Sequence, residues 1–230
     1  MPTALVLGAS RGLGLEFAKQ YLADGWRVYA THRAEADRVR LRDLGAQTLA
    51  LDVLAADDLA GLAWQLEGER IDVAVVNAGV YGPRDSHPQH PPTNGEFDLV
   101  MHTNVLAPMR LLPRLAPLIG PARGTLAFMS SRMGSISATG AGHGMLYRVS
   151  KAAENMVARA RARRAGRARR ARARAAPGVG AHRHGRAQRR RRGAGERGRH
   201  AARDRRRGRI PGRRLLRLPR AVARMVRPCC

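Results

Sequence analysis

The fold is decided by one stretch near the N-terminus, Ala4-Leu5-Val6-Leu7-Gly8-Ala9-Ser10-Arg11-Gly12-Leu13-Gly14. An apolar run of strand length enters a glycine-rich turn, and apolar residues at helical spacing follow from Leu15 to Leu22. This order predicts a strand, a tight turn and a helix whose free amides can bind an anion. Gly8 permits an unusual backbone angle, Gly12 lets the main chain approach a ligand, and Gly14 lets the helix pack closely on the strand. A tight turn in any α/β domain would need similar glycines, so later residues decide between the two interpretations.

Four further segments have the length and composition of strands, and helical patterns separate them. The expected strands are Arg27–Thr31, Thr48–Val53, Ile71–Val76 and Gly124–Met129. The expected helices are Val39–Leu44, Leu59–Leu66 and Phe97–Ile119, the last interrupted by Pro108 and Pro113. The segment Ile71–Val76 is almost continuously apolar, which is typical of a parallel sheet covered on both faces. The chain therefore predicts an α/β fold with a Rossmann-type, doubly wound parallel sheet.

Small and polar residues follow the expected strands at the edge where open α/β sheets bind ligands. Asn77-Ala78-Gly79 follows the fourth strand, and Ser131 follows the fifth. Asp52 lies near the end of the third strand, where it could contact a ligand or could cap the helix at 59–66. Asn104 lies within the long helical pattern, where an Asn is usually a satisfied core amide. Further on, Tyr147-x-x-x-Lys151 places two ionisable side chains on one face of a helix.

In this order, these residues resemble the short-chain dehydrogenase/reductase family, and most of all its small carbonyl-reducing members. The resemblance covers residues 1–157, which we interpret as one dinucleotide-binding domain. It implies an oxidoreductase that moves a hydride between a nicotinamide cofactor and a ketone, aldehyde or alcohol. The catalytic residues that it implies are Asn104, Ser131, Tyr147 and Lys151. The cofactor-binding residues that it implies are Gly8, Ser10, Arg11, Gly12, Leu13, Gly14, Arg33, Asp52, Val53, Asn77, Ala78 and Gly79.

The spacing of Tyr147 and Lys151 suits the reduction of a carbonyl group. Hydride transfer to a carbonyl needs an acid for the developing alkoxide, and a free tyrosine with a pKa near 10 is poorly matched to neutral pH. We expect the Lys151 ammonium to stabilise the phenolate and to lower the pKa of Tyr147. Under the resemblance, Lys151 also holds the nicotinamide ribose, Ser131 orients the substrate oxygen, and Asn104 holds a water in the proton relay. Taken alone, Ser131 could merely cap a turn.

The end of the second strand indicates which nicotinamide cofactor binds. An acidic residue there would hold the ribose hydroxyls of NAD, whereas an arginine accommodates the 2′-phosphate of NADP. The chain has Thr31-His32-Arg33 at this point, with Arg11 as a second candidate. The sequence therefore predicts NADP(H) over NAD(H), unless Arg33 is only a solvated loop charge. We expect no metal site, because His87 and His90 lack the spacing of metal ligands.

The positive charge of the chain is concentrated in its C-terminal third. Residues 1–157 contain 15 Lys and Arg against 15 Asp and Glu, whereas residues 158–230 contain 28 Arg against Glu196 and Asp204. The formal net charge of +26 therefore belongs to 158–230. The resemblance implies two more strands, a Pro-Gly turn and a substrate lid after Val157, but this pattern is not readable there. We expect a truncated sheet followed by an irregular or disordered Arg-rich segment that contains no strand.

Two hypotheses explain the Arg-rich segment. It could bind nucleic acid, although only non-specifically and in a salt-dependent way, because it lacks interleaved aromatic residues. Alternatively, a GC-rich gene lost its reading frame between about Val157 and Ala173. Read one nucleotide later, codons for Pro177–His184 can encode Pro-Gly-Trp-Val-Arg-Thr-Asp-Met, which resembles the family's Pro-Gly turn. In that case the chain could be impaired, or could be a non-catalytic remnant that binds a dinucleotide. The nucleotide sequence across the codons for Asn155–Pro177 distinguishes the two hypotheses.

Cysteine content and hydropathy predict the cellular setting. The two cysteines, Cys229 and Cys230, are adjacent and offer neither a disulfide framework nor a metal site. No stretch approaches the roughly 20 apolar residues of a membrane span, and the N-terminus lacks the pattern of a signal peptide. We therefore expect a cytoplasmic protein that acts on a small-molecule substrate. The resemblance allows a homo-oligomer.

Overall fold

The centre of the protein is a parallel sheet of six strands. The computed structural model describes residues 1–119, 124–139, 142–167 and 172–175. The strands are β1 (Thr3–Leu7), β2 (Arg27–His32), β3 (Gln47–Ala50), β4 (Val73–Val76), β5 (Thr125–Phe128) and β6 (Arg172–Ala175). Their order is β3-β2-β1-β4-β5-β6, and each neighbouring pair is parallel. The chain thus winds outward from β1 in both directions, which confirms the Rossmann-type fold.

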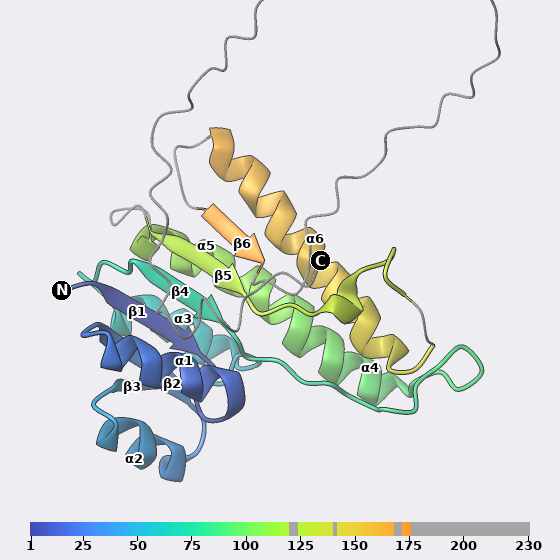
Figure 1. Cartoon of the computed structure of the whole chain (residues 1–230), viewed down its shortest axis with the longest axis horizontal. Helices are drawn as coiled ribbons and strands as arrows, with labels where there is room; N and C mark the ends of the chain where they lie inside the picture. The colour runs from blue at the N-terminus through green and yellow to red at the C-terminus, as the bar shows by residue number, and fades with distance from the viewer. Residues whose placement is uncertain (120–123, 140–141, 168–171, 176–230) are drawn as a thin grey trace, which may run out of the picture.

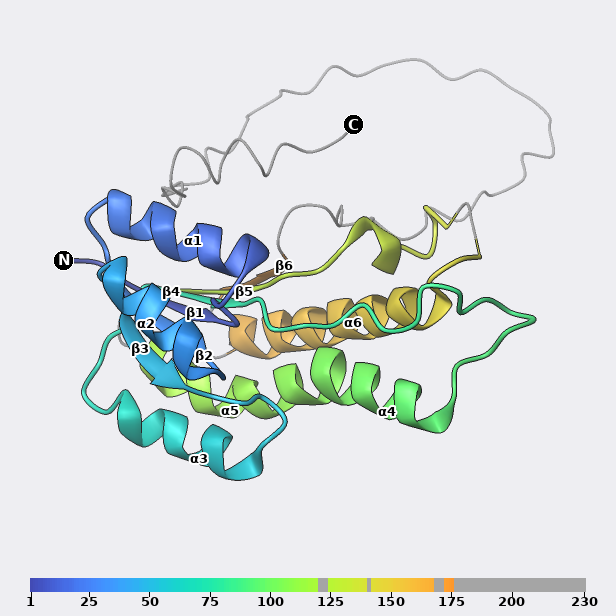
Figure 2. The ribbon, with the colours of Figure 1, turned by 90° about the horizontal axis from the view of Figure 1, so that it is seen from below.

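Helices cover both faces of this sheet (Figure 1). They are α1 (Gly12–Ala23), α2 (Glu35–Asp43), α3 (Ala56–Gln65), α4 (Asn94–Met101), α5 (Ala107–Ile119) and α6 (Met145–Arg167), with a π-helical turn η1 (His102–Leu106) and a 3₁₀ turn η2 (Arg132–Gly134). Figure 2 shows α1 on one side of the sheet and α3, α5 and α6 on the other. Because crossovers between parallel strands are right-handed, the reversal of winding direction after β3 moves the later helices to the opposite face.

The alternation of side chains along β1 divides the core into two layers. Ala4 and Val6 pack in a cluster with Ala18 and Tyr21 of α1. Leu5 and Leu7 belong to a larger cluster on the opposite face, built with leucines of α3 and α5. All five β1 residues are buried, and four of them are apolar, so neither face of this strand is exposed to solvent. A strand of this kind is stable only when both faces are covered, which the helices achieve.

The long helical pattern before β5 is divided by the π-helical turn. Thr93 caps the start of α4 in a capping box, in which its side chain accepts from the Glu96 backbone and the Glu96 carboxylate accepts from the Thr93 backbone. The turn η1 then widens the helix by one residue at its centre, where Asn104 lies. The prolines inside α5 are Pro113 and Pro117. The structure therefore places Asn104 at a local distortion rather than in a regular helix.

Two expectations about strands need correction. The third strand ends at Ala50, one residue before its last backbone hydrogen bond to β2, in which the Leu51 amide donates to the His32 carbonyl at 2.9 Å, and Leu51 and Val53 remain buried in the core. We expected no strand after Val157, and this is wrong: Arg172–Ala175 forms β6 and pairs with β5. Backbone groups can pair at a sheet edge whatever the side-chain composition, so apolar periodicity did not reveal this strand. The predictions for residues 176–230, including a missing seventh strand and disorder, lie outside the described residues.

Candidate functional site

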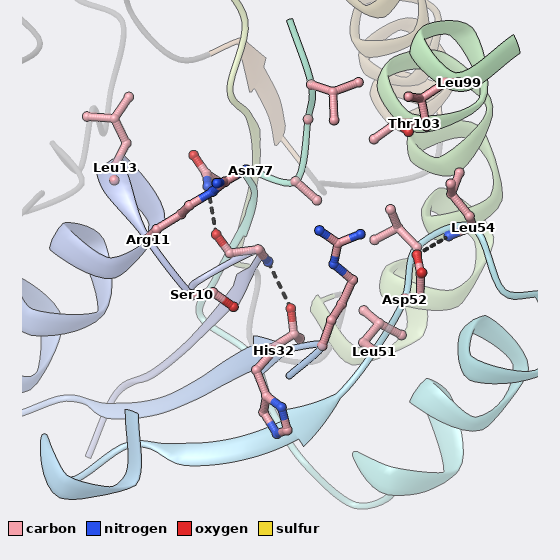
Figure 3. Close-up of a pocket in the computed structure, with 18 residues that line it drawn as sticks. Ser10, Arg11, Leu13, His32, Leu51, Asp52, Leu54, Asn77, Leu99 and Thr103 are labelled. Atoms are coloured by element: carbon pink, nitrogen blue, oxygen red, sulfur yellow. Dashed lines mark hydrogen bonds between the residues drawn. The ribbon is translucent and has the colours of Figure 1, made fainter. Parts of the chain in front are cut away.

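A cleft of about 430 Å³ opens at the carboxyl ends of β1, β2 and β4. Most of the residues predicted to bind a cofactor line it, as Figure 3 shows for several of them. They are Gly8, Ser10, Arg11, Gly12, Leu13, Arg33, Asp52, Val53, Asn77, Ala78 and Gly79. The sequence analysis did not assign Thr31, His32, Leu51, Leu54, Val80, Leu99 and Thr103, which complete the lining. Gly14 lies beneath the glycine turn, where it packs α1 against β1.

The glycine turn is held in place by hydrogen bonds to β2 and to the residue after β4, among them one from the Ala9 amide to the Thr31 carbonyl at 3.1 Å. The Gly8 amide donates to Thr31 Oγ1 at 2.8 Å, and Asn77 Nδ2 donates to the Gly8 carbonyl at 2.8 Å. Gly8 has a φ of +83°, and a Cβ there would lie 2.7 Å from the Ala78 nitrogen. A Cβ on Gly14 would lie 2.0 Å from the Gly8 carbonyl oxygen. Neither position tolerates a side chain, so the turn, Asn77 and α1 form one closely packed unit.

The start of α1 and the nearby charges suit a phosphate-bearing ligand. A Cβ on Gly12 would meet no heavy atom within 4 Å, so its backbone faces open space at the helix start. Arg11 and Arg33 are exposed side chains that line the same cleft. Helix N-termini and arginines both stabilise anions. The residues present therefore fit a dinucleotide such as NAD(P), whose pyrophosphate needs such an anion site.

Asp52 does not cap α3, contrary to one of the two interpretations left open by the sequence. The N-cap of α3 is Ala55, which makes no side-chain hydrogen bond. Asp52 Oδ1 instead accepts from the Leu54 amide at 2.9 Å, and the Asp52 amide donates to Asp58 Oδ2 at 2.7 Å. These bonds stabilise a turn that keeps Asp52 at the cleft, where Figure 3 shows it apart from Arg11. Its predicted contact with adenine remains a proposal.

Asn104 connects this cleft to the helix that carries Tyr147 and Lys151. Its side chain is fully buried and makes three hydrogen bonds. Oδ1 accepts from the Val80 amide at 2.9 Å, and Nδ2 donates to the Val80 carbonyl at 2.8 Å and to Ser150 Oγ at 3.0 Å. The Asn104 side chain therefore behaves as a buried core amide whose oxygen and nitrogen both have hydrogen-bond partners. Because Val80 lines the cleft, Asn104 also fixes the wall of the cleft relative to α6.

Lys151 is held at the junction of β5 and the cleft. Its Nζ donates to the Met129 carbonyl at 2.9 Å and to Glu154 Oε2 at 2.7 Å. A Cβ built on Gly79, which lines the cleft, would lie 3.6 Å from this Nζ and 3.2 Å from Asn104 Oδ1. An ammonium has three N–H donors, so one remains for a group in the cleft or for Tyr147.

Tyr147 lies beside Lys151, Ser131 and Tyr81. Lys151 Nζ is 5.7 Å from the Tyr147 ring centroid, and the Tyr81 ring stacks on Tyr147 with centroids 4.5 Å apart. Ser131 Oγ accepts from the Met133 amide at 3.1 Å, so the predicted turn cap exists, and the Ser131 side chain is also near enough to Tyr147 to lower its pKa. The four residues predicted to be catalytic therefore come from η1, the end of β5 and α6, and they converge on one edge of the sheet.

The acidity of Tyr147 differs from the expectation. Burial and the negative charge of Glu154 raise the pKa of Tyr147 above its ordinary value, and the hydrogen bond with Ser131 lowers it by less. We expected Lys151 to lower this pKa, but its ammonium is paired with Glu154, whose carboxylate offsets the positive charge. Glu154 was missed in the sequence, where its position three residues after Lys151 was the available signal. Tyr81 was also missed, because the loop after Gly79 shows no periodicity.

Comparison with known proteins places this arrangement in a family. A sequence profile described as "short chain dehydrogenase" matches residues 2–181. The chain belongs to the short-chain dehydrogenase family. The match continues past Val157, where we had placed the end of the resemblance, and it includes the β6 segment.

Individual members of the short-chain dehydrogenase family support the assignment. The chain is 32% identical over 178 residues to the short-chain dehydrogenase/reductase atnB of Arthrinium sp, covering 68% of this chain and 66% of that protein. A short-chain dehydrogenase/reductase from Burkholderia multivorans, solved with bound NADP, is 36% identical with a TM-score of 0.67, covering 72% of this chain and 74% of that one. A carbonyl reductase from Pseudomonas aeruginosa PAO1, solved with NADP, is 31% identical with a TM-score of 0.65, covering 71% and 76%.

The similarity to the curated relatives is partial in length. The chain spans 40% of the short-chain dehydrogenase fogG of Aspergillus ruber, to which it is 32% identical over 145 residues, and 45% of human retinol dehydrogenase 16, to which it is 31% identical. Among the described residues, none of the helices has the length and apolar content needed to cross a membrane.

Proposed function

We propose that this chain reduces ketones or aldehydes with NADPH, and oxidises the corresponding alcohols in reverse. The observation that carries the proposal is the convergence of Ser131, Tyr147 and Lys151 beside a cleft lined by the glycine turn. The solved relatives with bound NADP and the name carbonyl reductase given to one of them support the same chemistry.

The proposed roles follow from the contacts of each side chain. When bound, the reduced cofactor supplies the hydride. Tyr147 donates its proton to the substrate oxygen as negative charge develops there, and Ser131 orients that oxygen through its hydroxyl. Lys151 stabilises the resulting phenolate with its remaining N–H donor. Asn104 holds Val80, in the wall of the cleft, in a fixed position relative to Ser150 on α6. We propose that a water beside Asn104 returns the proton to Tyr147 through Lys151.

Replacing the proton donor tests the reaction. In Tyr147→Phe we expect kcat for NADPH-dependent reduction of a panel of aldehydes and ketones to fall about 100-fold or more. Tyr29→Phe is the matched control, because Tyr29 is a buried tyrosine on β2 whose hydroxyl contacts Glu69, outside the site, and kcat should be unchanged. Binding of NADPH without turnover of any carbonyl compound or alcohol would favour a non-catalytic, nucleotide-binding remnant instead.

We further propose that Arg33 gives a preference for NADP(H), with Arg11 as a second contact. Charge-assisted hydrogen bonds to the 2′-phosphate should make Arg33→Ala bind NADP⁺ about 10- to 100-fold more weakly while leaving NAD⁺ affinity unchanged. Arg42→Ala on α2 removes an exposed arginine outside the cleft lining and serves as the control. Equal loss of affinity for both nucleotides would show that Arg33 does not discriminate between them.

The setting of the protein also remains a proposal. We propose a cytoplasmic location on the basis of the cysteine content, and a homo-oligomer on the basis of the family resemblance. We also propose that Met1 to Val157 form the catalytic domain.

Cutting the chain after Val157 would remove the end of α6 and β6, so an intact chain and the cut chain should be compared by sedimentation and by NADPH titration. If DNA binding disappears on cutting while nucleotide binding persists, the Arg-rich segment binds nucleic acid.

A further inference from the structure

A buried ion pair stands next to the proton donor, and the reaction proposed above uses only one of its members, Lys151. Lys151 and Glu154 are 4% and 1% exposed, and Lys151 Nζ lies 2.7 Å from Glu154 Oε2. The two residues are three positions apart on α6. Lys151 also donates to the Met129 carbonyl at the end of β5. The ammonium is thus fixed between a carbonyl and a carboxylate, both supplied by the chain itself.

The carboxylate is retained in this position by the lysine. Burial raises the pKa of Glu154, while the charge and hydrogen bond of Lys151 lower it by less. Removing one member of a buried ion pair leaves an uncompensated charge, which is strongly unfavourable. The Glu154 carboxylate therefore competes with the Tyr147 phenol for the Lys151 ammonium.

The groups that act on Tyr147 come from several elements. On α6 they are Lys151, with Nζ 5.7 Å from the ring centroid, and the carboxylate of Glu154. From the loop after β4, Tyr81 stacks on the ring, and behind it the Arg84 guanidinium lies 5.5 Å from the Tyr81 ring centroid. From the end of β5, the Ser131 side chain lowers the pKa of Tyr147. The η1 contribution to this region, Asn104, is uncharged and reaches Ser150 rather than Tyr147. Lys151 and Glu154 form a buried ion pair on the same helix as the phenol.

We propose that Glu154 is a positioning residue that anchors the Lys151 ammonium on the Met129 carbonyl and neutralises its charge beside the Tyr147 ring. As a result, Tyr147 is expected to keep its proton to higher pH. The functional meaning rests on the proposed function: a phenol that holds its proton favours reduction of a carbonyl over oxidation of an alcohol.

The test is the titration of Tyr147 in the full chain, which does not depend on enzymatic activity. Tyrosinate absorbance is measured against pH for a protein and for its Tyr147→Phe counterpart, and the difference reports Tyr147 alone. In Glu154→Gln the midpoint should fall by about one pH unit or more, because a nearby negative charge is lost while the ammonium remains. Glu154→Asp restores the charge and should return the midpoint toward that of the parent. Glu67→Gln removes an exposed carboxylate just after α3 and should leave the midpoint unchanged.

A second variant keeps the proposal testable if Glu154→Gln fails to fold with an unpaired lysine. Lys151→Met/Glu154→Leu removes both charges. The titration midpoint of Tyr147 should stay close to the parent value, because the intact ion pair exerts no net charge on the phenol. A midpoint that rises by about one unit in this double variant would overturn the proposal, as would an unchanged midpoint in a folded Glu154→Gln. If the shift occurs in a chain that turns over no carbonyl compound, the positioning role stands and the proposed function fails.

Discussion

The sharpest prediction concerns Gly14, where the packing of α1 on β1 leaves no room for a side chain. A Cβ in Gly14→Ala would lie 2.0 Å from the Gly8 carbonyl oxygen and 2.6 Å from Asn77 Nδ2. Both distances are far below van der Waals contact, and the oxygen belongs to the backbone, so rotation of a side chain cannot relieve the overlap. The helix must move away from the strand, and the hydrogen bond from Asn77 to Gly8 is lost with it.

The magnitude follows from these two effects. Overpacking costs about 1–3 kcal/mol, and leaving a buried hydrogen-bonding group without its partner costs about 1–3 kcal/mol. We therefore expect Gly14→Ala to lower the free energy of unfolding by about 2–6 kcal/mol. Gly95→Ala is the matched control, because a Cβ on Gly95 in the first turn of α4 meets no heavy atom within 4 Å. There the higher helix propensity of alanine should stabilise the protein by about 0.5–1 kcal/mol.

Urea denaturation followed by circular dichroism measures both variants. At an unchanged m-value, a loss of this size should lower the midpoint for Gly14→Ala by about 1–2 M. The midpoint for Gly95→Ala should stay at the parent value or rise slightly. If Gly14→Ala unfolds at the parent midpoint, the close packing of the turn on α1 is not a source of stability, and the reasoning is wrong.

The remaining predictions concern hydrogen bonding and pH. Asn104→Ala removes the partner of both the amide and the carbonyl of Val80, so urea unfolding should show a loss of about 2–4 kcal/mol. Thr103→Val, one residue earlier, should be neutral or slightly stabilising in the same assay, because the buried Thr103 Oγ1 has no hydrogen-bond partner in the part of the chain that the structure describes. Burial and the charge of Asp24 raise the pKa of Tyr21 to about 12. Since the folded pKa lies above the unfolded value of about 10, the stability that Tyr21 contributes is complete below about pH 10 and is lost as pH rises toward about 12. Tyr21→Phe should therefore reduce the alkaline loss of stability by up to about 3 kcal/mol, as measured by urea unfolding at about pH 9 and about pH 12; an identical alkaline loss in both proteins would contradict this.

The sheet was predictable chiefly because β1 and β4 are almost entirely apolar and buried, and because small or polar residues follow the strands. Thr48–Val53 shows the limit of that signal: Leu51 and Val53 are buried, but the strand ends at Ala50 and only the Leu51 amide still bonds to β2. Apolar sequence reports burial, whereas strand length is set by pairing. The Arg-Ala alternation at 172–175 shows the converse, since backbone pairing with β5 forms a strand that composition argues against.

The candidate site was predictable in its members but not in its electrostatics. Spacing placed Tyr147 and Lys151 on one face of a helix, and the structure has them in one cluster. The direction of the pKa change depends on which group the ammonium meets, and that group, Glu154, is fixed by side-chain packing on α6. A sequence pattern can assign residues to a face of a helix, but it cannot decide which of two neighbours a flexible lysine selects.

The strand order has a consequence for how the protein is made. During synthesis, β1 can pair with β2 as soon as residue 32 has left the ribosome, but its other edge waits for β4 at residues 73–76. For that interval, one edge of the buried, largely apolar strand β1 is an open template for a foreign strand. The hydrogen bond from Lys151 to the Met129 carbonyl needs residue 151 and therefore forms after these strands have paired. The candidate catalytic site is thus completed later in synthesis than the central strands.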